Sequence, residues 1–128
     1  MKPCPFCSLE QKHLIHENQH MRVIFDGFPV TRGHALIIPR RHIASFFELN
    51  EAERDAALRA MDATKAILDE RFNPDGYNIG VNIGTAAGQT VHHVHIHLIP
   101  RYKGDMEDPS GGVRGVIPNK QKYGGDPS

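Results

Sequence analysis

Hydrophobic and polar residues alternate strictly over residues 93–98, where histidines take every second position and aliphatic residues fill the positions between them. Successive side chains on a β-strand point to opposite faces, so this pattern predicts a strand with one apolar face and one imidazole face. The apolar face would belong to the core. Solvated strand faces usually carry Thr, Lys, Glu or Ser, so three histidines in register indicate chemistry rather than simple contact with water.

Three other segments read as strands. Residues 21–25 are followed by a turn sequence at residues 26–29, and residues 35–39 form a nearly continuous apolar run that suits a strand buried on both faces. Residues 77–84 alternate between aliphatic residues and small or amide residues. The link of residues 85–89 is short, so this strand and the histidine strand are expected to pair antiparallel.

One long amphipathic helix is predicted over residues 51–72. Asn50 can cap its start, and Glu53 follows three positions later, as in a capping box. Apolar residues then recur at helical spacing with aspartates opposite them, until an Asn-Pro-Asp-Gly sequence at residues 73–76 ends the pattern. No residue of this helix indicates a catalytic role, so it is interpreted as a packing helix.

The length of 128 residues fits one domain, and we expect residues 1–128 to form it, with residues 102–128 as an irregular C-terminal tail. Lysine plus arginine equals aspartate plus glutamate, 15 against 15, which argues against nucleic acid or a membrane surface as a partner. The sequence shows no signal-peptide pattern and no stretch of about 20 apolar residues, so a cytoplasmic protein is expected.

Cys4 and Cys7 form a C-x-x-C pair, whose thiolates can hold one tetrahedral zinc ion and leave two ligand positions open. The sequence contains no further cysteine, so histidines must complete the set. The local candidates are His13 and His16; the distant candidates are His42 and a member of the histidine strand. A redox pair is the competing interpretation, and zinc is favoured because no strand precedes the pair to give a thioredoxin-like context.

Three histidines on one strand face suit two kinds of chemistry. They can coordinate a catalytic metal that activates a water molecule. Alternatively, one imidazole attacks a phosphorus atom as the nucleophile, while its neighbours stabilise charge and protonate the leaving group. Histidine suits the second role because its neutral form is abundant near neutral pH.

Other residues beside these strands could contact a ligand. Asp26 stands where a strand ends, and it is either a turn-forming aspartate that bonds its own backbone or a carboxylate that accepts ribose hydroxyl groups. His34 enters a buried strand, an unexpected place for a histidine. Gln89 and Thr90, at the mouth of the histidine strand, could offer hydrogen-bond donors to a phosphate, and Asn82 on the neighbouring strand could offer its amide.

The sequence His93-Val94-His95-Ile96-His97-Leu98-Ile99 resembles the His-x-His-x-His-x-x signature, with apolar x, of the histidine triad superfamily of nucleotide hydrolases and transferases. The resemblance covers nearly the whole chain, because the C-x-x-C pair, the Asp26 turn, Gly33-His34, the Asn82 strand and Gly88-Gln89-Thr90 follow the family's order. It implies an α+β fold, an antiparallel sheet of about five strands with one long helix, and usually a homodimer.

The resemblance also implies roles by position. His95 matches the nucleophile, His97 the histidine that contacts the phosphate and the leaving side, and His34 a histidine that supports the triad. Four residues match nucleotide-binding positions: Asp26 for the ribose, and Asn82, Gln89 and Thr90 for the phosphates. A structural zinc would be bound by both cysteines, a histidine after the buried strand and the first triad histidine, here Cys4, Cys7, His42 and His93.

The implied activity is hydrolysis at the α-phosphate of a purine nucleotide through a nucleotidyl-histidine intermediate, with release of AMP. Gln89-Thr90 together with Pro100-Arg101 resembles the branches that cleave dinucleoside polyphosphates, so a diadenosine polyphosphate is the expected substrate. The alternatives are a nucleoside phosphoramidase or nucleotidyltransferase of the same family, a metal-dependent hydrolase that uses the three histidines as ligands, and a nucleotide-binding or zinc-stabilised interaction module without turnover.

Overall fold

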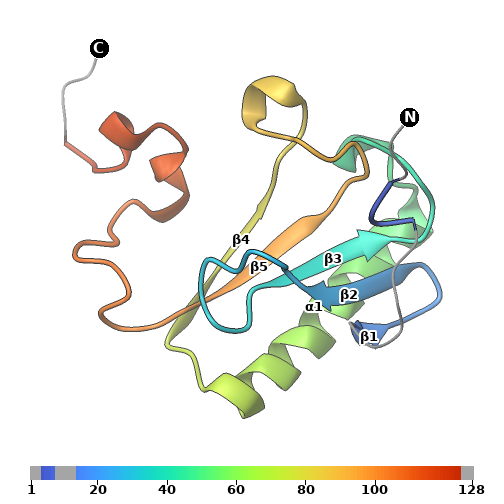
Figure 1. Cartoon of the computed structure of the whole chain (residues 1–128), viewed down its shortest axis with the longest axis horizontal. Coiled ribbons are helices and arrows are strands. Elements are labelled where there is room, and N and C mark those ends of the chain that lie inside the picture. Colours follow the sequence, from blue (N-terminus) through green and yellow to red (C-terminus); the bar gives the residue numbers. More distant parts are fainter. Residues whose placement is uncertain (1–3, 8–13, 125–128) are drawn as a thin grey trace.

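The computed structural model describes residues 4–7 and 14–124. Within these residues, five strands form one antiparallel sheet in the order β1-β2-β3-β5-β4, and one long helix, α1, covers a face of it (Figure 1). The strands are β1 (Leu14–Glu17), β2 (Met21–Phe25), β3 (Ala35–Pro39), β4 (Gly76–Val81) and β5 (Ile96–Arg101), and α1 spans Glu51–Phe72. The predicted α+β fold is therefore confirmed.

The helix α1 begins and ends where the sequence predicts. The Asn50 side chain accepts a hydrogen bond from the Glu53 N–H, and the Glu53 carboxylate accepts one from the Asn50 N–H. Asn73 ends the helix in the left-handed conformation, with φ of 49°. Buried alanines of α1 and Leu68 then pack against apolar side chains of β2, β3 and β5, which forms the main core.

The other face of the sheet carries a smaller apolar cluster, formed by Ile24, Leu36 and Ile38. His97 of β5 pairs with Leu36 of β3 and with Gly80 of β4, so its side chain lies on this second face. The fold thus separates a helix-covered face, which supplies most of the core, from a face on which histidine and small residues meet.

The histidine strand is shorter than predicted, because β5 begins at Ile96 rather than at His93. Its pairing with β3 stops at the Ile37–Ile96 pair. Beyond that point the ladder cannot continue, because Pro39 has no N–H to donate to β5. The Pro39 carbonyl accepts a hydrogen bond from the imidazole of His93 instead of one from a backbone N–H. The alternation in burial nevertheless extends to Val94, which is 1% exposed.

Two other boundaries differ from the prediction. β4 ends at Val81 rather than at Gly84, which has φ of 89° and leads into the short 3-10 helix η3 (Thr85–Ala87). A further 3-10 helix, η2 (Phe46–Glu48), precedes α1. The strand β1 was not predicted, because it has only four residues and its register is broken beside His16, which leaves no periodicity to detect.

The segment expected to be an irregular tail contains two short 3-10 helices, η4 (Gly112–Val116) and η5 (Pro118–Lys120). Figure 1 shows this segment, in red, beside the β4 edge of the sheet and across an open space from η3. None of the helices in the described ranges has the length and apolarity that crossing a membrane requires.

Candidate functional site

Four side chains converge at one end of the sheet as a possible metal site. The Sγ atoms of Cys4 and Cys7 lie 3.4 and 3.5 Å from the Nδ1 atom of His93. The Nδ1 atom of His42 lies 3.2 Å from the Cys7 sulfur and 3.1 Å from His93 Nδ1. All four potential ligand atoms lie within 4.8 Å of one another, although Cys4 and His93 are 89 positions apart in the chain.

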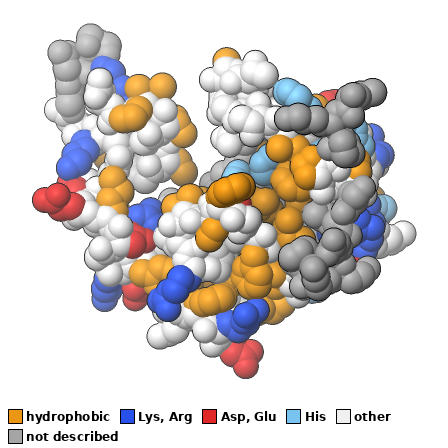
Figure 2. Space-filling model, in the orientation of Figure 1, with side chains coloured by type: hydrophobic (Ala, Val, Ile, Leu, Met, Phe, Trp, Pro, Cys, Tyr) orange, Lys and Arg blue, Asp and Glu red, His pale blue; other side chains and the backbone are white. Residues whose placement is uncertain are grey.

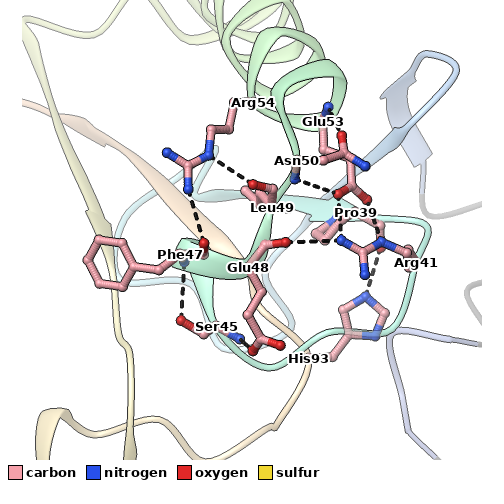
Figure 3. A network of polar contacts seen from close by, with 10 residues as sticks. All are labelled: Pro39, Arg41, Ser45, Phe47, Glu48, Leu49, Asn50, Glu53, Arg54 and His93. Carbon is pink, nitrogen blue, oxygen red and sulfur yellow. Dashed lines mark hydrogen bonds and ion pairs between the residues drawn. The ribbon is translucent and has the colours of Figure 1, made fainter.

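Hydrogen bonding fixes which nitrogen of His93 faces this cluster. The Nε2–H group donates to the Pro39 carbonyl at 2.7 Å (Figure 3), so the neutral imidazole keeps its lone pair on Nδ1. His93 is fully buried, and burial lowers its pKa, which favours this neutral form. A second-sphere carbonyl of this kind orients a metal-binding histidine.

The segment that carries His42 is tied to the start of α1. Arg41 binds the carboxylate of Glu53 through two nitrogens, at 2.8 and 3.1 Å, and also donates to the Glu48 carbonyl (Figure 3). The Arg41 guanidinium holds the pKa of Glu53 below its ordinary value, so the carboxylate stays charged near neutral pH. These bonds join Arg41, just before His42, to Glu48 and Glu53, which follow it, and so fix the connection from β3 to α1 around His42.

The four side chains fit a zinc ion. Ligands on one tetrahedral zinc lie ~3.3–3.8 Å apart, given Zn–N bonds of about 2.0 Å and Zn–S bonds of about 2.3 Å. Two sulfurs with two imidazoles are a common structural donor set, and the buried Nδ1 lone pair of His93 faces that set. Of the two local candidates, His16 lies in β1 outside the cluster, and His13 falls outside the described residues.

His95 is held differently from His93. Its Nδ1–H group donates to the backbone carbonyl of His93 at 3.0 Å, which leaves the lone pair on Nε2. Its ring contacts two others, with centroid distances of 4.9 Å to Phe6 and 5.1 Å to His97. An imidazole with a free Nε2 and a fixed Nδ1–H has the form that a nucleophile requires.

His97 receives a hydrogen bond whose direction the backbone determines. The N–H of Val30 donates to Nδ1 of His34 at 3.0 Å, so the proton of neutral His34 is on Nε2. That Nε2–H then donates to Nδ1 of His97 at 2.9 Å. The proton of His97 is consequently on its own Nε2, where it can be donated to a ligand.

Gly33 is needed to set His34 in this position. Its φ of 87° is strained for any residue with a side chain, and a Cβ atom would lie 2.9 Å from the ring of Phe72 and 3.2 Å from Pro100. The chain therefore turns tightly into β3, and His34, which is 2% exposed, is placed under the site.

Asp26 serves the turn and also faces the histidines. One carboxylate oxygen accepts the N–H of Phe28 at 2.8 Å, which is the turn-forming role considered for it. The other oxygen lies 3.5 Å from Nε2 of His34. Asp26, His34 and His97 form a second group of potential metal ligands, but their two nitrogens already pair with each other. In the described residues, no such group joins all three triad histidines.

The buried His34 is expected to make stability depend on pH. Burial lowers the pKa of His34 below the ordinary imidazole value, and Asp26 opposes this only in part. The unfolded chain therefore binds a proton more readily below pH about 6.5, so the free energy of unfolding should fall as the pH falls from about 7 to about 5. Urea unfolding at both pH values should show a smaller fall for His34→Asn, which keeps an acceptor for Val30. Equal falls in the two proteins would contradict this account.

A shallow pocket of about 240 Å³ lies over β4 and β5, beside His97. Its floor is formed by residues of the second sheet face, and Val30 and Val113 stand at its sides. Figure 2 shows histidine side chains next to apolar ones on this side of the molecule, and a notch between the C-terminal segment and the body. Gly80 and Asn82 line the pocket, as expected if this strand faces a ligand.

The two residues at the mouth of β5 differ in availability. Gln89 is 4% exposed, and its amide accepts from Gly84 N–H at 2.8 Å and donates to the carbonyls of Ala44 and Val91. In this conformation it holds the loop together and has no free N–H for a phosphate. Thr90 is exposed beside it.

Asn78, whose amide the alternation of its strand also indicated, lines the pocket, and its oxygen accepts from Arg101 at 2.6 Å. Arg101 in turn binds both oxygens of Asp105 at 2.8 Å. The backbone N–H of Val30 orients His34, and Phe6 contacts His95. The roles of the Val30 N–H and of the Phe6 ring carry no signal in the sequence, because backbone donors and contacts between distant residues leave no local pattern.

Comparison with known proteins agrees with this geometry. Residues 9–104 match the family model described as the HIT domain. An uncharacterised HIT-like protein from Methanocaldococcus jannaschii is 36% identical over 108 residues, which cover 81% of this chain and 83% of that protein. A bis(5'-adenosyl)-triphosphatase from Dictyostelium discoideum is 39% identical over 80 residues, 62% of this chain and 54% of that protein.

Comparison with solved structures indicates the same family. The crystal structure of a zinc-bound histidine triad family protein from Mycobacterium smegmatis matches with a TM-score of 0.61 and 34% identity, and the match covers 74% of this chain and 69% of that one. The resemblance carried by residues 93–99 is therefore confirmed. Because the family model spans most of the sequence, the chain belongs to the HIT, or histidine triad, domain family.

Proposed function

We propose that this protein is a nucleotide hydrolase in which His95 attacks the α-phosphorus of a purine nucleotide. The observation that carries the proposal is the pair of opposite tautomers on neighbouring histidines. His95 keeps a lone pair on Nε2 because its Nδ1–H is bonded to a carbonyl, whereas His97 keeps a proton on Nε2 because its Nδ1 accepts from His34. One imidazole can thus act as nucleophile beside another that can donate a hydrogen bond to the leaving oxygen.

The reaction would proceed in two steps. The Nε2 lone pair of His95 forms a bond to the α-phosphorus, and the bond from phosphorus to the leaving oxygen breaks with its electron pair on that oxygen. The Nε2–H group of His97 donates a hydrogen bond to that oxygen and stabilises the negative charge that grows there. A water molecule then attacks the phosphorus, the N–P bond breaks with its electrons returning to Nε2 of His95, and the proton of the water leaves to solvent.

The binding residues are proposed from the family resemblance, except Asn78, which is added because it lines the pocket together with Asn82. Asp26 would accept hydrogen bonds from the ribose through the oxygen that the turn leaves free. The amides of Asn82 and Asn78, which line the pocket, and the exposed Thr90 would donate to phosphate oxygens, which stabilises the charge that grows there. Gln89 would act with them by holding the loop, because its amide is bonded to the backbone in this conformation.

Two further parts of the proposal concern substrate and metal. A diadenosine polyphosphate is proposed as substrate, supported by the name of the Dictyostelium discoideum relative and by Gln89-Thr90 and Pro100-Arg101 in the sequence. Zinc is proposed for Cys4, Cys7, His42 and His93, supported by the four converging atoms and by the zinc-bound relative. The ion would cross-link the chain and would supply no chemistry at the phosphate.

We also propose that the protein is a homodimer. β4 is the last strand of the sheet, so within the described residues its outer edge has no partner strand. Ile79 of this strand is 51% exposed, and open apolar edges favour pairing with another chain. The molar mass in solution tests this point.

The activity is tested by incubating the protein with diadenosine triphosphate, diadenosine tetraphosphate and adenosine phosphoramidate in parallel, and by measuring AMP. AMP from a polyphosphate, together with an acid-labile adenylylated protein, is the expected result. AMP from the phosphoramidate alone would overturn the polyphosphate assignment and leave a phosphoramidase. No AMP from any of them, with nucleotide still bound, would overturn the hydrolase and leave a binding module.

A further inference from the structure

Phe6 connects the metal-binding turn to the histidine triad. Residues 4–7 form a tight turn, closed by a hydrogen bond of 3.2 Å from Cys7 N–H to the Cys4 carbonyl. Both sulfurs of the turn face His93, and Phe6 stands between the cysteines in the sequence. The Phe6 ring lies edge-to-face with His95 at a centroid distance of 4.9 Å, and 6.1 Å from the ring of His93.

The Phe6 ring is itself held in place. It packs against the smaller apolar cluster of the sheet, Ile24, Leu36 and Ile38. The turn that carries it would be fixed by two metal ligands, one on each side of Phe6. Phe6 is therefore held firmly enough to support the imidazole of His95, which it contacts.

His95 needs such a support. Among residues 4–7 and 14–124, the imidazole makes one hydrogen bond, from Nδ1–H to the His93 carbonyl, and this bond fixes the tautomer. The torsion that turns an imidazole about its Cβ–Cγ bond is broad, so one hydrogen bond leaves the ring plane loosely determined. The rings of Phe6 at 4.9 Å and His97 at 5.1 Å restrict that rotation, because both contacts have the edge-to-face geometry that aromatic pairs prefer.

We propose that Phe6 is a positioning residue for His95, through which the metal-held turn keeps the Nε2 atom directed at the phosphate. The proposal rests on the proposed function only in naming His95 as the nucleophile. The metal site would then influence the reaction without touching the substrate. It would act through the Phe6 ring, and also through His93, whose side chain is in the metal cluster and whose carbonyl holds His95.

The side-chain chemistry separates positioning from packing. A leucine at position 6 would still cover Ile24, Leu36 and Ile38 but would lack the ring that meets the imidazole. Leu14 offers a matched control, because it is also partly buried and packs against the same cluster. Leu14→Ala therefore weakens the cluster without removing a ring from His95.

The test compares Phe6→Leu, Phe6→Tyr and Leu14→Ala with the wild type, each with measured zinc content. For Phe6→Leu we expect unchanged zinc, a fall in kcat of about 10- to 100-fold and little change in KM, because displaced reacting groups slow the chemical step. Phe6→Tyr should recover most of kcat. Leu14→Ala should keep wild-type kcat even where its melting temperature falls.

A second readout does not depend on turnover. In the substrate-free protein, the ¹⁵N signals of the His95 imidazole should be sharp in wild type and Leu14→Ala, where the ring keeps one orientation, and broadened in Phe6→Leu, where the ring rotates about its Cβ–Cγ bond. Unchanged signals together with wild-type kcat in Phe6→Leu would overturn the proposal. So would a Phe6→Leu protein that loses zinc and regains full activity on zinc addition. A wild type without nucleotide turnover would overturn the proposed function, while the imidazole signals would still decide the role of Phe6.

Discussion

Replacing His95 by asparagine is expected to lower kcat at least about 10⁴-fold and to leave nucleotide affinity nearly unchanged. Asparagine can still donate a hydrogen bond to the His93 carbonyl, so the backbone around residue 93 keeps its partner. It lacks the Nε2 lone pair, and without that atom no bond to phosphorus can form. Rates under saturating diadenosine polyphosphate, and binding measured by titration calorimetry, check the two halves of this prediction.

His92 supplies the matched control for this variant. It neighbours the triad in sequence, is exposed and is absent from both groups of potential metal ligands. His92→Asn makes the same chemical change and should retain wild-type kcat. A His95→Asn protein that hydrolyses the nucleotide at the wild-type rate would contradict the nucleophilic mechanism. A loss of equal size in both variants would show that the substitution damages the segment rather than the chemistry.

The elements with strong periodicity could be predicted from the sequence. The range of α1 follows from its capping box and its apolar spacing, and β2 and β3 follow from their apolar runs. These signals are local, so they survive folding unchanged. The start of β5 could not be predicted, because it depends on Pro39, a residue of another strand whose carbonyl takes the imidazole of His93.

Residue types could be predicted for the site, but their partners could not. Alternation indicates that His95 and His97 point to one side, yet it does not show that a backbone N–H at Val30 fixes the protons of His34 and His97. Gln89 illustrates the same limit. Its position suggested a phosphate donor, and in the folded chain its amide is bonded to backbone groups that only the tertiary structure brings near.

If the proposed zinc is bound, replacing either Cys4 or Cys7 by serine is expected to abolish its binding and to lower the free energy of unfolding by about 4–5 kcal/mol. The link between Cys4 and His93 closes a loop of 89 positions, and a cross-link of that length stabilises a fold by roughly this amount through loop-closure entropy. Native domains have only about 5–15 kcal/mol in total, so the loss should lower the melting temperature by roughly 10 °C or more.

The same site predicts how a chelator acts and which histidine is a ligand. Chelator should abolish activity slowly, with the rate of unfolding, because a structural ion leaves as the fold opens; immediate loss would favour the alternative of a catalytic metal on the triad.

His42→Asn should lose zinc as the cysteine variants do, whereas His16→Asn, outside the cluster, should keep it. Zinc loss in His16→Asn with retention in His42→Asn would reverse the ligand assignment and free His93 from the metal. The fold would then hold the triad segment through the His93 bond to Pro39 and the bond from the Val94 N–H to the Ile43 carbonyl, and His93→Asn would test the first of these without affecting the metal.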